Sequence, residues 1–219
     1  MKINTIRLRL ALGILGMALP VIVLVLCLVF GYGVPDSISA TYYLAPTITP
    51  FMGILISAGV VLICYQGYDK QDDIICTIAG IFAFGICLFP CSAKDLIPVW
   101  TEVEFPWYVG TFQVPRSVSS WIHNICALCF FALLAYNSLF LFTKGDGNPT
   151  LKKKKRDIIY RVCGIGMILS FILIIPISIL EIWGGVWLVE TIALAFFGIS
   201  WLTKSDIFPF LFCDTPYKD

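Results

Sequence analysis

Six long stretches with almost no charged side chain recur along this chain, and they constrain its fold more than any other feature. They cover residues 10–32, 50–68, 74–91, 121–143, 158–180 and 182–203. About 20 apolar residues in an α-helix cross the hydrocarbon core of a bilayer. A backbone in that core must satisfy its own hydrogen bonds, and the stretches lack the alternation of barrel strands. Each stretch is therefore expected to be a transmembrane α-helix.

The composition agrees with this prediction. Hydrophobic residues make up 59% of the 219 residues and charged residues 13%, whereas a soluble domain has about 25% charged residues. The formal net charge is only +1, so no nucleic-acid partner is expected. We predict an all-α, polytopic membrane protein that forms a single domain over residues 1–219. Membrane lipids are its expected partners, and the sequence indicates no particular protein partner.

The N-terminal basic leader followed by an apolar run is similar to a signal peptide, but the run from residue 10 to residue 32 is too long for one. We interpret it as a retained first helix.

With six spans, thirteen Lys and Arg residues fall on the side of the two chain ends, and only Lys94 and Arg116 fall on the other. Because basic residues accumulate on the cytoplasmic side, both termini are predicted to be cytoplasmic. The basic run at 152–156 fits a topology anchor, with an anionic-lipid patch as the alternative.

The two long outer loops, residues 33–49 and 92–120, are rich in Tyr, Trp, Pro and Ser. Loops of this length are uncommon unless they are functional. The second loop carries five aromatic residues, Trp100, Phe105, Trp107, Tyr108 and Phe112. Anchoring at the membrane interface and a lid over the bundle are equally compatible with this composition.

Cysteines and histidine limit the chemistry. The chain has nine cysteines, an odd number, and most fall in apolar runs, where cysteine behaves as a small hydrophobe. The C-x-x-C pair Cys126 and Cys129 is expected to pack in the same way. His123 is the only histidine, so a zinc site with three histidines is excluded. We expect neither a metal nor a cofactor.

Polar residues inside the predicted helices are few, and such residues are functional hypotheses by default. Glu190 lies within the last stretch, and His123 lies two residues inside the outer end of the fourth. Asn137 follows His123 at a spacing of 14, which places both near one helix stripe. The first outer loop adds polar groups on the same side of the membrane. The candidate ligand-binding residues are Ser37, Ser39, Tyr42, His123, Asn137 and Glu190.

Three functions remain open. The first is a protein without enzymatic activity that binds lipid or a small ligand in an outward-facing polar pocket. The second is an intramembrane hydrolase or transferase acting on lipid, with a Ser/His/Glu site in which His123 is the base and Ser37 or Ser39 the nucleophile. The third is a small-molecule or proton-coupled transporter with Glu190 as the titrating group. No particular catalytic residue is established by the sequence.

Several motifs resemble a bacterial family of short six-helix membrane proteins of unknown function. They are Gly13-Ile-Leu-Gly16, Ser37-Ile-Ser-Ala-Thr-Tyr-Tyr43, Tyr65-Gln-Gly-Tyr-Asp69, Ala79-Gly80, Leu88-Phe-Pro90, Ile122-His123, Tyr160-Arg-Val-Cys-Gly164 and the segment from Glu190 to Leu202. The likeness covers nearly the whole chain. It implies a multi-pass protein of a cell membrane, namely a bacterial cytoplasmic membrane.

A more distant resemblance is to the damage-regulated autophagy modulator family of eukaryotic six-helix proteins. It rests on the serine-containing first outer loop, on Pro50-Phe-x-Gly53, and on a histidine that opens the fourth helix. That family has a proline-x-isoleucine-serine loop, whereas this chain reads Pro35-Asp-Ser-Ile-Ser39. The resemblance implies a six-helix bundle in which the outer loops and His123 share a polar site. It also implies a role in membrane and lipid-anchor homeostasis, without an established reaction.

Overall fold

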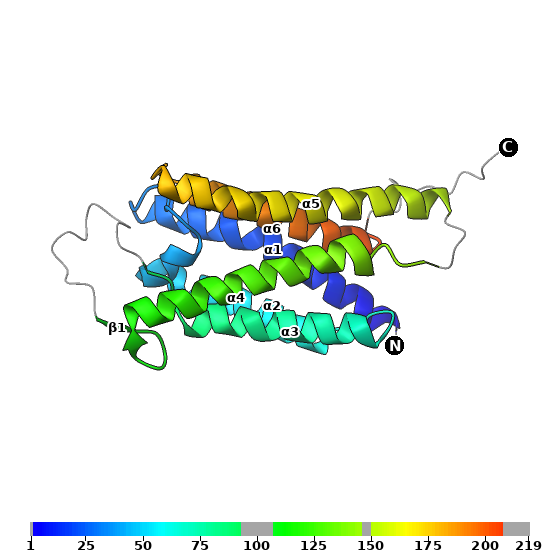
Figure 1. Ribbon diagram of the computed structural model, residues 1–219, viewed down its shortest axis with the longest axis horizontal. Coiled ribbons are helices and arrows are strands. Elements are labelled where there is room, and N and C mark those ends of the chain that lie inside the picture. The colour runs from blue at the N-terminus through cyan, green and yellow to red at the C-terminus, as the bar shows by residue number, and fades with distance from the viewer. Residues whose placement is uncertain (1, 93–106, 146–149, 208–219) are drawn as a thin grey trace.

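The structure is a computed structural model that describes residues 2–92, 107–145 and 150–207. Six helices that are long and apolar enough to cross a membrane run along one common direction (Figure 1). They are α1 (Lys2–Val29), α2 (Ala45–Cys64), α3 (Lys70–Leu88), α4 (Arg116–Tyr136), α5 (Leu151–Ile179) and α6 (Gly185–Lys204). The predicted all-α, polytopic fold is confirmed.

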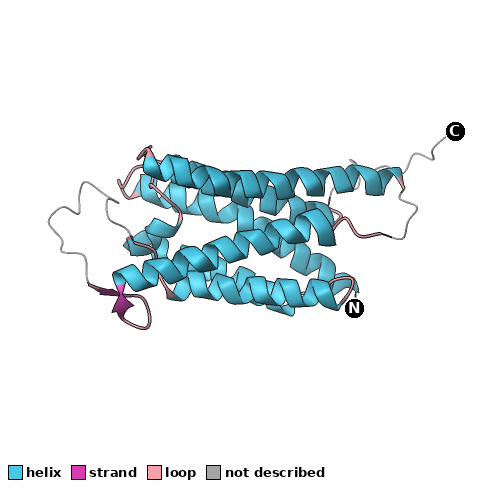
Figure 2. Cartoon of the chain, viewed as in Figure 1, coloured by secondary structure: helices cyan, strands magenta, loops and turns pink. Residues whose placement is uncertain are grey.

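Four short elements complete the described chain (Figure 2). The 3₁₀ turn η1 (Ser39–Tyr43) lies in the loop between α1 and α2. Strands β1 (Tyr108–Val109) and β2 (Val114–Pro115) form an antiparallel hairpin before α4. The π-helical turn η3 (Asn137–Leu141) continues α4. Residues 93–106 of the predicted second outer loop lie outside the described residues. The anchor or lid predicted from its aromatic residues depends partly on Trp100 and Phe105, which lie in this undescribed part.

The helix ends differ from the predicted ones, because hydropathy marks the apolar part of a helix rather than its ends. The second predicted span runs to residue 68, but α2 ends at Cys64 and Tyr65 is extended. Residues 65–68 are uncharged, yet the amides of Gly67 and Tyr68 bond to carboxylates of α3. The fifth span begins earlier than predicted, at Leu151, because the basic residues 152–156 continue the helix beyond the apolar core.

The helices form a closed ring in sequence order. Each packs against the next along the chain, and α6 closes the ring against α1. The contact between α4 and α5 is the least extensive of the six. The start of α1 and the end of α6 lie at one end of the bundle, which we call the basic end (Figure 1). The other end holds η1 and the β-hairpin, and we call it the loop end.

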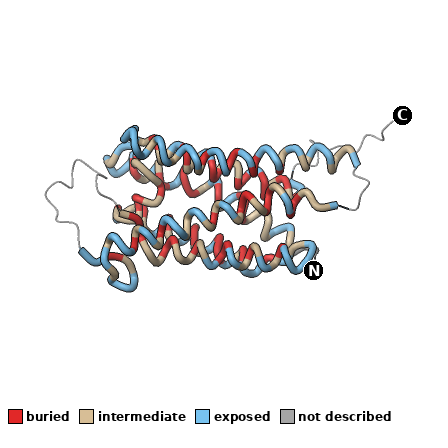
Figure 3. Tube along the Cα trace, in the orientation of Figure 1, coloured by how far each residue is buried: buried red, intermediate tan, exposed pale blue. Residues whose placement is uncertain are grey.

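Large apolar side chains cover the outer surface of the bundle, and buried residues follow its inner faces (Figure 3). Helix α5 shows this most clearly, since Ile172, Ile175 and Ile179 are each more than half exposed. An exposed apolar surface of this extent requires an apolar surrounding. The arrangement agrees with a multi-pass membrane protein.

Glycines allow the closest helix pairs. A Cβ atom at Gly80 of α3 would lie 2.6 Å from the carbonyl oxygen of Gly59 on α2. A Cβ at Gly198 of α6 would lie 3.0 Å from the carbonyl oxygen of Gly13 on α1. Small residues let membrane helices approach in this way where apolar burial contributes little.

Candidate functional site

A cavity of about 800 Å³ lies at the loop end of the bundle. Most of its lining comes from α4, α5 and α6, and the loop between α1 and α2 closes one side. Four of the six predicted site residues line it, namely Ser37, Ser39, His123 and Glu190. The structure therefore brings together groups from three segments that are far apart in the sequence.

The loop between α1 and α2 is hydrogen-bonded to the beginning of α6. The backbone amide of Ile38 donates a hydrogen bond of 2.5 Å to the Glu190 carboxylate, and the Ser39 amide also interacts with this carboxylate. The amide of Trp187, in the first turn of α6, donates to the carbonyl oxygen of Asp36 at 2.7 Å. One short loop segment thus satisfies a free N–H group at the helix start and a partly buried carboxylate. Glu190 holds the cavity wall in place.

His123 is 3% exposed and hydrogen-bonds to the backbone at the end of α3. Its Nδ1 lies 2.8 Å from the carbonyl oxygen of Phe89 and 3.2 Å from that of Ile86. Both acceptors are carbonyl oxygens, so Nδ1 carries the proton and donates it. The lone pair of the neutral ring is then on Nε2, for which no described residue supplies a hydrogen bond. His123 also lines the cavity, and its Nε2 is a free acceptor there.

The rest of the lining is mostly apolar, and it includes residues on the outer surface of α4 and α5. Phe131 of α4 and Phe171 of α5 line it, with ring centroids 5.2 Å apart. Three other lining residues are largely exposed on the outside of the bundle: Trp121 (71%), Leu128 (54%) and Ile175 (64%). The opening thus lies on the side of the bundle, at the level of the apolar surface.

The two remaining predicted residues lie elsewhere. Tyr42 does not line the cavity, and its ring packs edge-on against Tyr43, with centroids 5.3 Å apart. Asn137 is buried, as expected for the stripe it shares with His123, but lies towards the basic end in the π-helical turn. Its side chain contacts the thiol of Cys76 at 3.5 Å. Fourteen residues of helix rise about 21 Å, so the shared stripe does not make a shared site.

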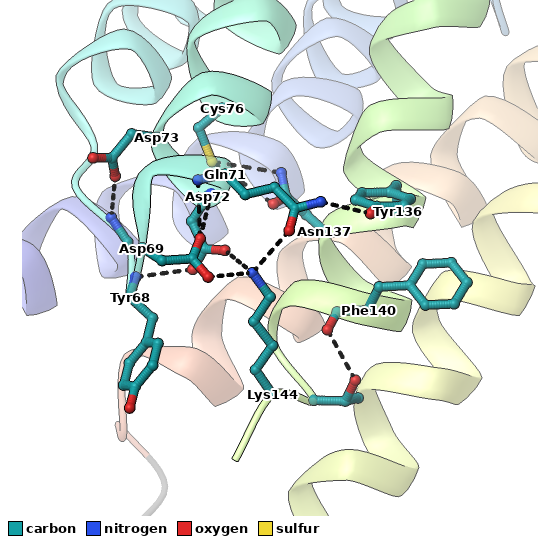
Figure 4. Close-up of polar contacts among 12 residues, drawn as sticks. Tyr68, Asp69, Gln71, Asp72, Asp73, Cys76, Tyr136, Asn137, Phe140 and Lys144 are labelled. Carbon is teal, nitrogen blue, oxygen red and sulfur yellow. Dashed lines mark hydrogen bonds and ion pairs between the residues drawn. The ribbon is translucent and has the colours of Figure 1, made fainter. Parts of the chain in front are cut away.

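A polar network joins α3 to the end of α4 near Asn137 (Figure 4). Lys144 donates to Asp69 and to Asp72, each at 2.8 Å. Gln71 joins the network by accepting from Lys144 at 3.3 Å and donating to the Tyr136 hydroxyl at 2.9 Å. The hydrogen bond from Lys144 is the main reason why the pKa of Asp69 is lowered. These polar groups satisfy one another, and they link the two helices.

Sequence reasoning missed several lining residues. Asp36 and Asn124 are direct neighbours of predicted residues, so sequence adjacency was the available signal. The sequence gave no signal for three others, Phe131, Phe171 and Ser178. The sequence around an apolar or small residue of a membrane helix is the same whether that residue faces a cavity or a neighbouring helix.

The geometry limits the chemistry of the site. His123 and Glu190 bond to different backbone groups and not to each other. Ser37 Oγ accepts from the amide of Ala40 at 3.0 Å, which is a local turn contact. Within the described residues, no group of three or more His, Cys, Asp or Glu side chains is arranged to hold a metal ion.

No family model, curated protein or solved structure matches this chain. The resemblances to the bacterial and eukaryotic six-helix families therefore stay predictions. The functional argument depends on the cavity and on the residues that line it.

Proposed function

We propose that this protein binds a membrane lipid, or a small amphipathic ligand, in the loop-end cavity, and that it is not an enzyme. The observation that carries the proposal is the two-part lining of the cavity. One part holds the polar groups of Ser37, Ser39, His123 and Glu190, and the other is mostly apolar and includes residues on the outer surface of α4 and α5. A molecule with a polar head and an acyl chain matches both parts. The volume of about 800 Å³ lies within the roughly 300–1,000 Å³ of ordinary ligand pockets.

The lining also favours one kind of head group. It includes two carboxylates, those of Asp36 and Glu190, and no described lysine or arginine. Serine hydroxyls, Asn124 and the free Nε2 of His123 supply hydrogen-bonding groups. A neutral hydroxylated head can bond to these groups, whereas an anionic head would find no described lysine or arginine in the lining. Monoacylglycerol is therefore a better probe than the fatty acid of the same chain length.

The test compares two substitutions on one helix. Ala127→Phe puts a large side chain into the cavity lining, whereas Ala132→Phe puts the same side chain on the exposed side of α4. With 1-oleoylglycerol added to the purified protein, thermal unfolding should shift upward by several degrees in the parent and in Ala132→Phe. This upward shift should be largely lost in Ala127→Phe. In the parent, oleate should shift thermal unfolding less than 1-oleoylglycerol does. An equal response of Ala127→Phe and the parent would contradict the proposal.

An intramembrane enzyme is the second candidate, because His123 lines the same cavity as Ser37 and Ser39 with its Nε2 unoccupied. In that case the cavity would hold the same lipid as a substrate. Release of glycerol or of free acid from 1-oleoylglycerol, measured during the same titration, distinguishes the two candidates.

A further inference from the structure

The described basic residues at the basic end fall into three groups. The first group pairs with carboxylates: Lys144 with Asp69 and Asp72, Lys152 and Arg156 with Asp206, and Lys153 with Asp157. The second group is exposed to the surroundings and comprises Arg7, Lys70, Lys154, Lys155 and Arg161. Arg9 and Lys204 form the third group. They are partly buried, and no described carboxylate lies within ion-pair distance of either.

These two residues lie side by side at the junction of α1 and α6. Arg9 Nη1 donates to the backbone carbonyl oxygen of Lys204 at 3.3 Å, and Arg9 Nε donates to the hydroxyl of Tyr65 at 3.1 Å. The guanidinium also lies over the Tyr65 ring, 5.6 Å from its centroid. Neutral partners thus fix the position of Arg9 and leave its charge uncompensated.

Lys204 is held in the same way by aromatic rings. Its Nζ lies 4.9 Å from the centroid of Phe142 and 5.8 Å from that of Tyr160. Cation–π contacts of this kind orient an ammonium group but do not neutralise it. Three cations lie close enough to repel the ammonium group of Lys204, namely Arg9, Lys153 and Arg156. The carboxylate of Asp72 attracts it, but this carboxylate is bonded to Lys144. Among the described residues, no hydrogen bond or ion pair occupies the ammonium group of Lys204, so it can bind an anion.

We propose that Arg9 and Lys204 bind a phosphate group at the basic end, separate from the loop-end cavity. Guanidinium and ammonium groups are the usual protein ligands of phosphate, since both form charge-assisted hydrogen bonds with it. The site lies at the end of the apolar helices, where the head groups of a bilayer would be. An anionic phospholipid can supply the phosphate from the membrane, and inorganic phosphate can supply it from solution.

The experiment uses the full-length chain purified in detergent and measures the midpoint of thermal unfolding. Phosphatidylglycerol, phosphatidylcholine or inorganic phosphate is added to the parent, to Lys204→Gln, to Arg9→Gln and to the control Lys154→Gln. We expect phosphatidylglycerol to raise the midpoint of the parent and of the control equally. The rise should fall by at least half in Lys204→Gln and in Arg9→Gln.

The three additives separate the sources of the phosphate. A rise with inorganic phosphate that depends on Lys204 assigns the site to a soluble anion, and a rise with phosphatidylglycerol alone assigns it to a lipid head group. Lys204→Arg keeps the charge and should keep the response, which separates loss of binding from loss of folding. If Lys204→Gln does not fold, Arg9→Gln decides the question. The proposal is wrong if both glutamine variants respond like the parent, or if Lys154→Gln loses as much of the response.

Discussion

In the network between α3 and the end of α4, polar side chains bond to one another, whereas at the loop end they bond to backbone groups and border a cavity. Asp72 and Lys144 form an ion pair within a network that joins α3 to α4 (Figure 4). Glu190 and His123 instead accept from or donate to main-chain groups of neighbouring loops. The side chains of the α3–α4 network pack against one another, whereas Glu190 and His123 border the cavity.

This difference separates structural from functional polar residues. A polar network that satisfies all its members stabilises helix packing and offers nothing to a ligand. Polar groups that are fixed by the backbone, next to an unfilled volume, are oriented before a ligand arrives. Two substitutions, one at each end, sharpen the comparison.

Asp72→Ala should have the larger effect on folding. Asp72 is 6% exposed, accepts from the amide of Tyr68 at 2.8 Å and pairs with Lys144. Its removal takes an acceptor from the partly buried amide of Tyr68 and leaves Asp69 as the only carboxylate paired with Lys144 among the described residues, which costs about 1–3 kcal/mol. Chemical unfolding in detergent should measure this loss, while the response to 1-oleoylglycerol in the folded fraction stays that of the parent.

Asp72→Asn is the matched variant for that measurement. It keeps an acceptor for Tyr68 and removes only the charge, so it should lose less stability than Asp72→Ala. Equal stability of Asp72→Ala and the parent would show that the basic-end network does not hold the two helices together.

Glu190→Gln should have a smaller effect on stability and a larger one on binding. The glutamine carbonyl still accepts from Ile38, but its NH₂ group cannot accept from the second loop amide, so about 1 kcal/mol is lost. The loop that closes the cavity is then held less firmly, and the response to 1-oleoylglycerol should fall while membrane insertion is unchanged. If the variant and the parent respond identically to every lipid class tested, the cavity is not the binding site.

The sequence predicts the helices well and the grouping of polar residues only in part. Long uncharged runs report lipid exposure directly, so the number and type of helices follow from them. The helix ends do not, because residues such as Tyr65 to Tyr68 are uncharged but lie in a turn. Charge along the chain also does not show that Arg9, in the first helix, meets Lys204, in the last.

The candidate site shows the same limit. His123 and Glu190 were identified because a polar group in a membrane helix is rare, and both line the cavity. Asn137 satisfied the same criterion but belongs to the packing at the other end. Helical spacing gives the face on which a residue lies, but it does not tell whether the space opposite is filled. That depends on the α4–α5 contact, which no local pattern encodes.

Photolabelling with a monoacylglycerol that carries a diazirine in its acyl chain tests the central claim most directly. The protein is labelled in a lipid bilayer and the modified peptides are mapped, with unlabelled 1-oleoylglycerol as competitor. We predict competable labels on the facing segments 120–131 of α4 and 171–178 of α5, which line the cavity. Labels spread over the outer faces of all six helices, and insensitive to the competitor, would contradict the account.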